Sequence, residues 1–259
     1  MVSPYIVEET GDFAVVFKPP KMHTVSAART IDESNASITL SLWCREKMPS
    51  MFDIMHRLDY ETHGLVLLAK NEKSYNIFKS AQDNGDFIKE YTAVCSPPVN
   101  ESLVLKSSHN ISQFPLTGFP ASPVIDCEPS PETPFIIESF FRSYGQGGKQ
   151  VRPVIEEGNL PRKRQKKTVK DKGGFYRTEI IKIKNNIFTI RIKRGFRHQI
   201  RCHLCWIGYP ILNDPLYFHG ETDKMPGFLA LGSHALYFPD PENGNQREYR
   251  VPLAEIIRA

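Results

Sequence analysis

Two stretches of the chain gather side chains that are suited to nucleophilic or acid–base chemistry. In the first, HRLD at residues 56–59, Asp59 lies two residues after Arg57 and shortly before an apolar run at residues 65–69. The second, RHQIR at residues 197–201, is basic. A nearby arginine favours the ionised carboxylate, the form that acts as nucleophile or general base. Taken alone, Asp59 and Arg57 fit a surface ion pair before an edge strand better than they fit a catalytic site.

Other chemistries have little support. The sequence has no GxxxxGK phosphate loop, no GxGxxG fingerprint and no GxSxG nucleophile elbow. Cys202 and Cys205 have CxxC spacing, but a zinc site usually needs a second ligand pair, and none follows at a suitable spacing. We therefore expect no metal and no cofactor, and interpret both cysteines as apolar helix positions. A glycosidase-like pairing of Asp59 with Glu61 is an alternative, weakened by the turn expected between the two carboxylates.

The composition is that of an ordinary globular chain with locally concentrated positive charge. Of 259 residues, 40% are hydrophobic and 24% charged, with a formal net charge of +4. Basic residues cluster at 162–172 and 191–201, which favours a phosphate-rich partner. The N-terminus lacks a signal-peptide pattern, no apolar run approaches a membrane span, and the five scattered cysteines fit reduced thiols. We expect a cytoplasmic protein that is monomeric and does not engage a membrane.

Strands alternate with a few helices along the chain. Hydrophobic spacing predicts helices over residues 38–47, 71–84 and 198–207, with Asn71 as an N-cap. Strands are expected at residues 13–17, 65–69, 87–95, 135–144, 175–184, 187–193 and 249–253, and residues 228–238 form a last apolar segment. Asn185 and Asn186 fit a two-residue hairpin turn. The pattern predicts an α+β class, with a mixed, mostly antiparallel central sheet flanked by helices and long loops.

Two segments interrupt this pattern, at about 96–134 and 145–172, and are rich in Pro and Ser or in Gly and Lys. Loops of this length are functional or mobile when they occur inside a compact domain. The chain shows no internal repeat and no clear domain boundary. We therefore expect one domain over residues 1–259 that carries these segments as flexible insertions.

The chemistry-bearing stretches resemble the A-type, RluA-like RNA pseudouridine synthases. HRLDYETHGLVLLAK resembles that family's HRLDxxTSGxxxxAK signature, and GFRHQIRCHLCWIGYPILNDPLY resembles its GRxHQIRxHLxxxGxPIxGDxxY block. Lys18–Pro19, residues 89–91 and residues 229–241 resemble further blocks. The likeness runs from about Tyr5 to Leu253 and is poor over residues 96–172.

The resemblance implies the pseudouridine synthase fold and cofactor-free isomerisation of uridines in ribosomal or transfer RNA. It makes Asp59 the catalytic carboxylate, which attacks C6 of uracil or C1′ of ribose or assists glycal formation; these routes stay open. Arg201 matches the arginine that pairs with the aspartate, and Tyr91 matches the tyrosine that packs on the base and helps to move the C5 proton. The uridine must be flipped out of a paired helix, and Arg57 matches the residue that enters the stack.

Further residues are assigned by their positions in the same blocks. Those expected at the RNA-binding and base-flipping site, besides Arg57, are Lys18, His56, Arg197, His198 and Gln199. His198 and Gln199 fit an architectural or backbone-binding role better than a catalytic one. Ile200 or Leu204 would form the apolar wall of the uracil pocket.

The resemblance includes no N-terminal RNA-binding module before Tyr5, so the domain is expected to hold RNA with its own basic surface. The candidates are residues 162–172 and the basic faces of the predicted hairpin, which carry Lys182, Lys184, Arg191 and Lys193.

The chain departs from the family pattern at four places. His63 replaces a Ser or Thr and either binds RNA or fills space. Lys21 replaces a Gly after the first block, Asn213 replaces a Gly before Asp214, and Phe196–Arg197 stands where Arg-Thr is usual. The last change puts a phosphate contact of Arg197 in question. A non-catalytic RNA-binding or ribosome-assembly factor on the same fold is the alternative function, against which the joint presence of Asp59, Tyr91 and Arg201 argues.

Overall fold

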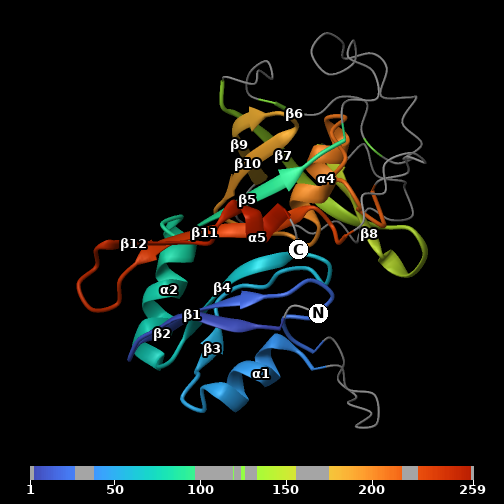
Figure 1. Cartoon of the computed structure of the whole chain (residues 1–259). Coiled ribbons are helices and arrows are strands. Elements are labelled where there is room, and N and C mark those ends of the chain that lie inside the picture. Colours follow the sequence, from blue (N-terminus) through green and yellow to red (C-terminus); the bar gives the residue numbers. More distant parts are fainter. Residues whose placement is uncertain are drawn as a thin grey trace. The chain divides into compact units, whose positions relative to one another are not determined.

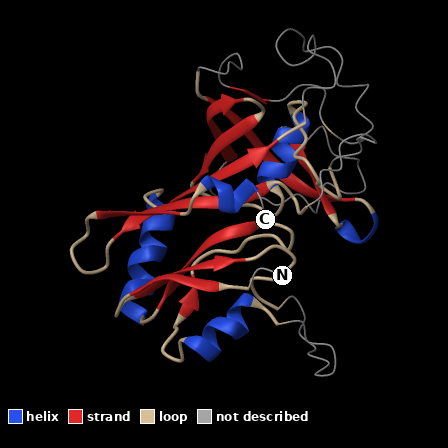
Figure 2. Cartoon of the chain, viewed as in Figure 1, coloured by secondary structure: helices blue, strands red, loops and turns tan. Residues whose placement is uncertain are grey.

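The computed structural model describes residues 3–26, 38–96, 119, 124–125, 133–155, 175–217 and 227–257. The chain divides into two compact units, the first formed by Met1–Thr92 with Gly227–Ala259 and the second by Ala93–Pro226. Both are built mainly from antiparallel strands with a few helices, which confirms the predicted α+β class (Figures 1 and 2). That the two units act as one catalytic domain stays a prediction, and the basic run at 162–172 lies outside the described residues.

The first unit is built on two fully buried strands. β2 (Phe13–Lys18) and β4 (His63–Ala69) pair antiparallel, and β4 runs parallel to β11 (Leu231–Pro239). The strand order is β1-β2-β4-β11-β5, with β3 added to β4 and β12 to β11. The remaining bounds are β1 Tyr5–Glu9, β3 Asp53–Ile54, β5 Ile88–Val94 and β12 Gln246–Arg250. The continuous apolar run at residues 65–69 indicated a buried strand, and a strand that is apolar on both faces is expected to be covered on both faces.

Helix α2 (Glu72–Asn84) covers β4 and β11, and its ends follow from local sequence. The Asn71 side chain accepts the backbone N–H of Ser74, and the chain leaves the helix at Gly85 with φ 80°. Four phenylalanines join the helix to the sheet by edge-to-face contacts with ring centroids 5.3–6.3 Å apart: Phe13, Phe78, Phe87 and Phe238.

Within its described residues, the first unit has two further helices, α1 (Leu40–Lys47) and α5 (Leu253–Ile257). The predicted last strand at 249–253 was misplaced, because β12 already ends at Arg250 and the chain turns into α5 after Pro252. A proline has no N–H to continue a ladder but fits well before a helix. None of the helices described is long and apolar enough to cross a membrane.

The second unit carries strands in the order β10-β9-β7-β6, with β8 paired to β7. Their bounds are β6 Val124–Ile125, β7 Phe135–Tyr144, β8 Gln150–Val154, β9 Tyr176–Lys184 and β10 Ile187–Ile192. Asn185 and Asn186 have φ of 52° and 59°, as in a type I′ turn, which confirms the predicted hairpin.

Helix α4 (Gln199–Trp206) packs against β8 and β9 of this unit. A short 3-10 turn, η3 (Gln146–Gly148), precedes β8, so residues 146–154 form regular structure within a segment that was expected to be flexible. Val151 and Val154 of β8 are buried.

Candidate active site

Asp59 lies on the loop between β3 and β4, and alternate residues of this loop are bonded to the body of the first unit. Nε2 of His56 accepts the backbone N–H of Leu67 at 3.2 Å. The Thr24 hydroxyl donates to the carbonyl of Leu58 at 2.9 Å and accepts the Leu58 N–H at 3.1 Å, so one side chain satisfies both backbone groups. The loop is therefore fixed to the body of the first unit at His56 and Leu58.

The residues that neighbour Leu58 in this loop are less buried than Leu58 itself. Arg57 is exposed, whereas Asp59 and Glu61 are half-buried. The backbone N–H of Thr62 donates to the carbonyl of Asp59 at 3.1 Å, which closes a turn that begins at Asp59. The alternation leaves Asp59 within reach of a ligand while its backbone is fixed.

A buried ammonium group supports the same loop from the end of β2. Lys18 is 0% exposed, and its Nζ donates to the carbonyl oxygens of Pro19 at 2.9 Å, Met22 at 2.8 Å and Tyr60 at 3.5 Å. Burial lowers the pKa of Lys18 to about 7, while the negative charge of Asp59 acts in the opposite direction. Lys18 thus ties the turn after β2 to the residue that follows Asp59.

Tyr91 of β5 is the second polar group, after Lys18, whose pKa is affected by the charge of Asp59. It is 5% exposed, and burial raises the pKa of its phenol, as does the negative charge of Asp59, while contact with Ser233 acts in the opposite direction. Tyr91 is therefore a neutral phenol near pH 7, able to donate a hydrogen bond or to pack on a ring. A half-buried carboxylate beside a neutral phenol is a suitable pair for covalent catalysis on a nucleobase or a sugar.

Two histidines of the signature stretch have structural contacts. His56 packs edge-on against Phe87 at 5.3 Å, and burial, with the charge of Lys89, holds the pKa of its imidazole well below the ordinary value. His63 is fully buried; its Nε2 lies 2.8 Å from the carbonyl of Ile256 in α5, and burial lowers its pKa to about 4. Of its two predicted roles, His63 takes the space-filling one, because it does not reach the surface.

Gly64 explains why the strand that follows the loop can approach β11. Its φ is +115°, and an added Cβ would overlap the backbone carbonyl of Ser233. Only glycine fits this close parallel contact between β4 and β11. The contact brings Ser233 to the part of the first unit that holds Tyr91.

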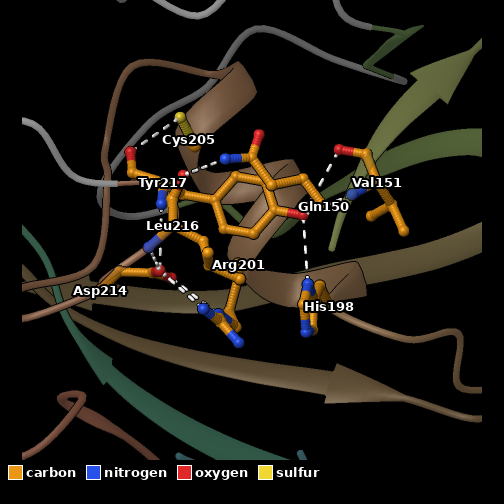
Figure 3. Close-up of polar contacts among 8 residues, drawn as sticks. All are labelled: Gln150, Val151, His198, Arg201, Cys205, Asp214, Leu216 and Tyr217. Carbon is orange, nitrogen blue, oxygen red and sulfur yellow. Dashed lines mark hydrogen bonds and ion pairs between the residues drawn. The ribbon is translucent and has the colours of Figure 1, made fainter. Parts of the chain in front are cut away.

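In the second unit, Arg201 of α4 forms a buried ion pair with Asp214 (Figure 3). Both contacts measure 2.7 Å, from Nε to Oδ2 and from Nη2 to Oδ1. Oδ1 of Asp214 also accepts the backbone N–H groups of Leu216 at 2.9 Å and Tyr217 at 3.1 Å. The predicted pairing of Arg201 with Asp59 stays a prediction, since the two residues belong to different units.

Tyr217 and His198 complete this cluster (Figure 3). The Tyr217 hydroxyl accepts the N–H of Val151 in β8 at 2.8 Å and lies 3.3 Å from Nδ1 of His198. Burial and the charges of Arg201 and Arg197 lower the pKa of His198 to about 3, so that its imidazole is neutral. His198 has φ 57° and begins α4 without a side-chain cap.

The neighbouring predicted residues bond mainly to backbone. The Arg197 guanidinium donates to the carbonyls of Gly148 and Gln150, although its side chain is exposed. Gln199 is buried: its Oε1 accepts the N–H of Phe196 at 2.9 Å and its Nε2 donates to the carbonyl of Arg177 at 2.9 Å. The architectural or backbone-binding role expected for Gln199 stays a prediction.

The apolar side of α4 is packed into the second unit. Ile200 and Leu204, predicted to wall a uracil pocket, are both buried, and that role stays a prediction. Cys202 and Cys205 are free thiols that lie close to the carbonyls of Val151 and Tyr217, and burial raises the pKa of both. Among the described residues no group of three or more His, Cys, Asp or Glu side chains is arranged to hold a metal ion.

Two supporting residues were not foreseen from the sequence. Thr24 lies in a segment without periodicity, so nothing marked it as the partner of Leu58. Ser233 lies within a block that resembled the family, but its place beside Tyr91 depends on the contact of β4 with β11.

A family model described as RNA pseudouridylate synthase matches residues 12–206 of this chain. An uncharacterized RNA pseudouridine synthase of Bacillus subtilis, YjbO, is 23% identical over 253 residues, which cover 96% of this chain and 72% of that protein. Ribosomal large subunit pseudouridine synthase C of Rickettsia prowazekii is 24% identical over 260 residues, which cover 98% of this chain and 69% of that protein.

Two solved structures show the same fold. Human RNA Pseudouridylate Synthase Domain Containing 1 aligns with a TM-score of 0.59 at 17% identity, over 96% of this chain and 83% of that one. Human RNA Pseudouridylate Synthase Domain Containing 4 aligns with a TM-score of 0.54 at 14% identity, over 95% of this chain and 87% of that one. With three quarters of its length matched by the family model, this chain belongs to the RNA pseudouridylate synthase family, whose members are isomerases that convert uridine in RNA to pseudouridine.

Proposed function

We propose that this isomerase modifies uridines of ribosomal or transfer RNA and uses Asp59 as its nucleophile. The observation that supports this role is the setting of Asp59: a half-buried carboxylate on a loop fixed by Lys18 and Thr24, whose charge raises the pKa of the buried Tyr91 phenol. The name of the Rickettsia relative, a ribosomal large subunit enzyme, favours ribosomal RNA as the substrate.

The reaction needs no external reactant. The N1–C1′ bond of uridine breaks, a C5–C1′ bond forms, C5 loses its proton and N1 gains one. Asp59 attacks C6 of the uracil or C1′ of the ribose, or it assists glycal formation. Each route requires an ionised, accessible carboxylate, and a fixed loop reduces the cost of orienting it.

Tyr91 would contact the flipped uracil as a neutral phenol. Its raised pKa disfavours the phenolate, so we propose that it packs on the base and donates a hydrogen bond rather than acting as the resting general base. Arg57, exposed on the same loop, would enter the RNA stack where the uridine has left.

Lys18 and His56 would act on the loop and not on RNA. Both were expected at the RNA-binding site, but the Lys18 ammonium is fully buried against backbone carbonyls, and the His56 ring accepts a backbone N–H. We propose that they position Asp59. For Arg201, whose guanidinium holds Asp214 in the second unit, the predicted role beside the aspartate is kept as a proposal.

Chemical mapping of pseudouridine in total RNA, from cells with and without the gene, tests the substrate. The proposal expects pseudouridine to disappear from a few defined positions in ribosomal or transfer RNA. Loss confined to another class of RNA would contradict the substrate assignment. Unchanged maps in all RNA classes would contradict the proposed cellular role altogether.

We further propose a cytoplasmic monomer. The cysteines in the described part of the chain are free thiols, which is typical of a reducing compartment. Light scattering on the purified protein should give the mass of one chain, and a mass of two chains or more would contradict the monomer.

A further inference from the structure

Tyr60 and His23 form an exposed aromatic pair next to the catalytic loop. Their ring centroids are 4.6 Å apart and their planes are inclined by 40°. Tyr60 follows Asp59 directly and is 41% exposed, and His23 is exposed as well. Packing in the hydrophobic core does not explain why these two rings are in contact, because both lie at the surface.

The backbone on either side of the pair is held in place. The Lys18 ammonium donates to the carbonyls of both Met22, which precedes His23, and Tyr60. On the other side, the Thr24 hydroxyl bonds both backbone groups of Leu58. The two loops are thereby joined on both sides of the rings, so little freedom remains to be lost when a ligand binds.

Two basic residues stand close to the pair in the sequence, although Tyr60 itself lies between Asp59 and Glu61. Lys21 and Arg57 are both exposed, and the Lys21 ammonium lies 5.2 Å from the centre of the Phe228 ring. Lys21 has φ 58°, so the chain turns at this residue, two positions before His23. Cations that suit phosphates together with exposed rings that suit bases are the combination by which proteins hold single-stranded RNA.

We propose that Tyr60 and His23 stack against a base of the RNA strand that flanks the flipped uridine. The proposal rests on the proposed function, since the flanking base is defined by the uridine at Asp59. The pair touches no reacting atom, so it is a binding element that contributes to the choice of RNA and not to the chemical step. Loss of a ring should therefore raise KM and leave kcat nearly unchanged.

The test compares stacking with backbone binding in the Asp59→Asn protein, which separates binding from turnover. The probe is a fluorescein-labelled single-stranded RNA of mixed sequence, about 12 nucleotides long, and its counterpart with an abasic sugar at every position. Fluorescence anisotropy at one salt concentration gives Kd for each. Tyr60→Ala should weaken binding of the base-containing RNA between about 5-fold and about 150-fold, and binding of the abasic RNA hardly at all. Tyr60→Phe should bind like the parent.

Phe52→Ala is the matched control. Phe52 is 45% exposed and forms a similar aromatic pair with Tyr75, at 5.3 Å, in the same unit. It has no assigned role in the site, so its loss should change neither Kd. Urea unfolding of each variant shows whether the fold is retained.

The proposal is overturned if Tyr60→Ala binds both probes as Phe52→Ala does, or if the parent protein does not distinguish the base-containing from the abasic RNA. Failure of the proposed function gives a different result: wild-type protein that retains the preference for bases but isomerises no uridine in ribosomal or transfer RNA.

Discussion

The ion pair between Arg201 and Asp214 makes a quantitative prediction for the second unit. Both residues are 2% exposed, and two charge-assisted bonds of 2.7 Å join them. Asp214→Asn keeps the shape of the side chain and an oxygen for the backbone N–H groups, but leaves the guanidinium without its counter-charge. Breaking a buried ion pair by removing one partner costs about 3–5 kcal/mol. With an m-value of about 2 kcal/mol per M, the urea midpoint should fall by about 2 M.

The two tryptophans of the chain provide the assay. Trp206 is buried in α4 of the second unit, and Trp43 lies in α1 of the first. In a Trp43→Phe background, Trp206 fluorescence follows the unfolding of the second unit, and a Trp206→Phe background follows the first. A loss smaller than about 1 kcal/mol in the Trp206 signal would refute the reasoning, because an exposed pair is worth no more than that.

Three further perturbations test the loop, the buried histidines and the basic hairpin. Lys18→Met should lower kcat at least about 10-fold with little change in RNA affinity, since a rise of about 1.4 kcal/mol in the activation free energy, caused by a less well positioned Asp59, gives that factor. An unchanged kcat would contradict the positioning role of Lys18. His203 is fully buried, and its pKa in the folded protein is lowered to about 3. As the pH falls, this histidine therefore becomes protonated in the unfolded chain before it does so in the folded protein. The free energy of unfolding should then decrease by about 1.4 kcal/mol per pH unit as the pH drops from about 6 towards 4. Urea midpoints across that range should show a smaller slope for His203→Asn, and an equal slope would contradict the assignment. Lys182→Gln with Lys184→Gln should reduce the slope of log Kd against log salt by about 1.4–1.8, as expected for two lost phosphate contacts, whereas Lys79→Gln on α2 should leave it unchanged; equal slopes in all three proteins would place the RNA elsewhere.

Local signals predicted much of the fold. Asn71 and Gly85 mark the ends of α2 because their side-chain and backbone preferences act within one turn. The Asn185–Asn186 hairpin was predictable for the same reason. β8 was missed because its burial depends on α4, which lies far along the chain.

Some residues of the candidate site could likewise be predicted from the sequence, and others could not. Asp59 and Tyr91 stand in recognisable blocks, so a resemblance in sequence identified them as candidates. The buried contacts of Lys18 were not predictable, because lysine is rarely buried and its acceptors are backbone carbonyls that no pattern of side chains records. The bond between Arg201 and Asp214 joins the helix to the turn that follows it, which depends on how the chain closes after α4.

The most direct test of the central claim is the pseudouridine content of a substrate RNA after incubation with Asp59→Asn protein. RNA from cells that lack the gene is treated with wild-type or variant enzyme, and pseudouridine is mapped chemically. If Asp59 is the nucleophile, the wild-type enzyme restores the missing pseudouridines, whereas the variant restores none while keeping wild-type RNA affinity and urea midpoint. Restoration by the variant would contradict a nucleophilic Asp59.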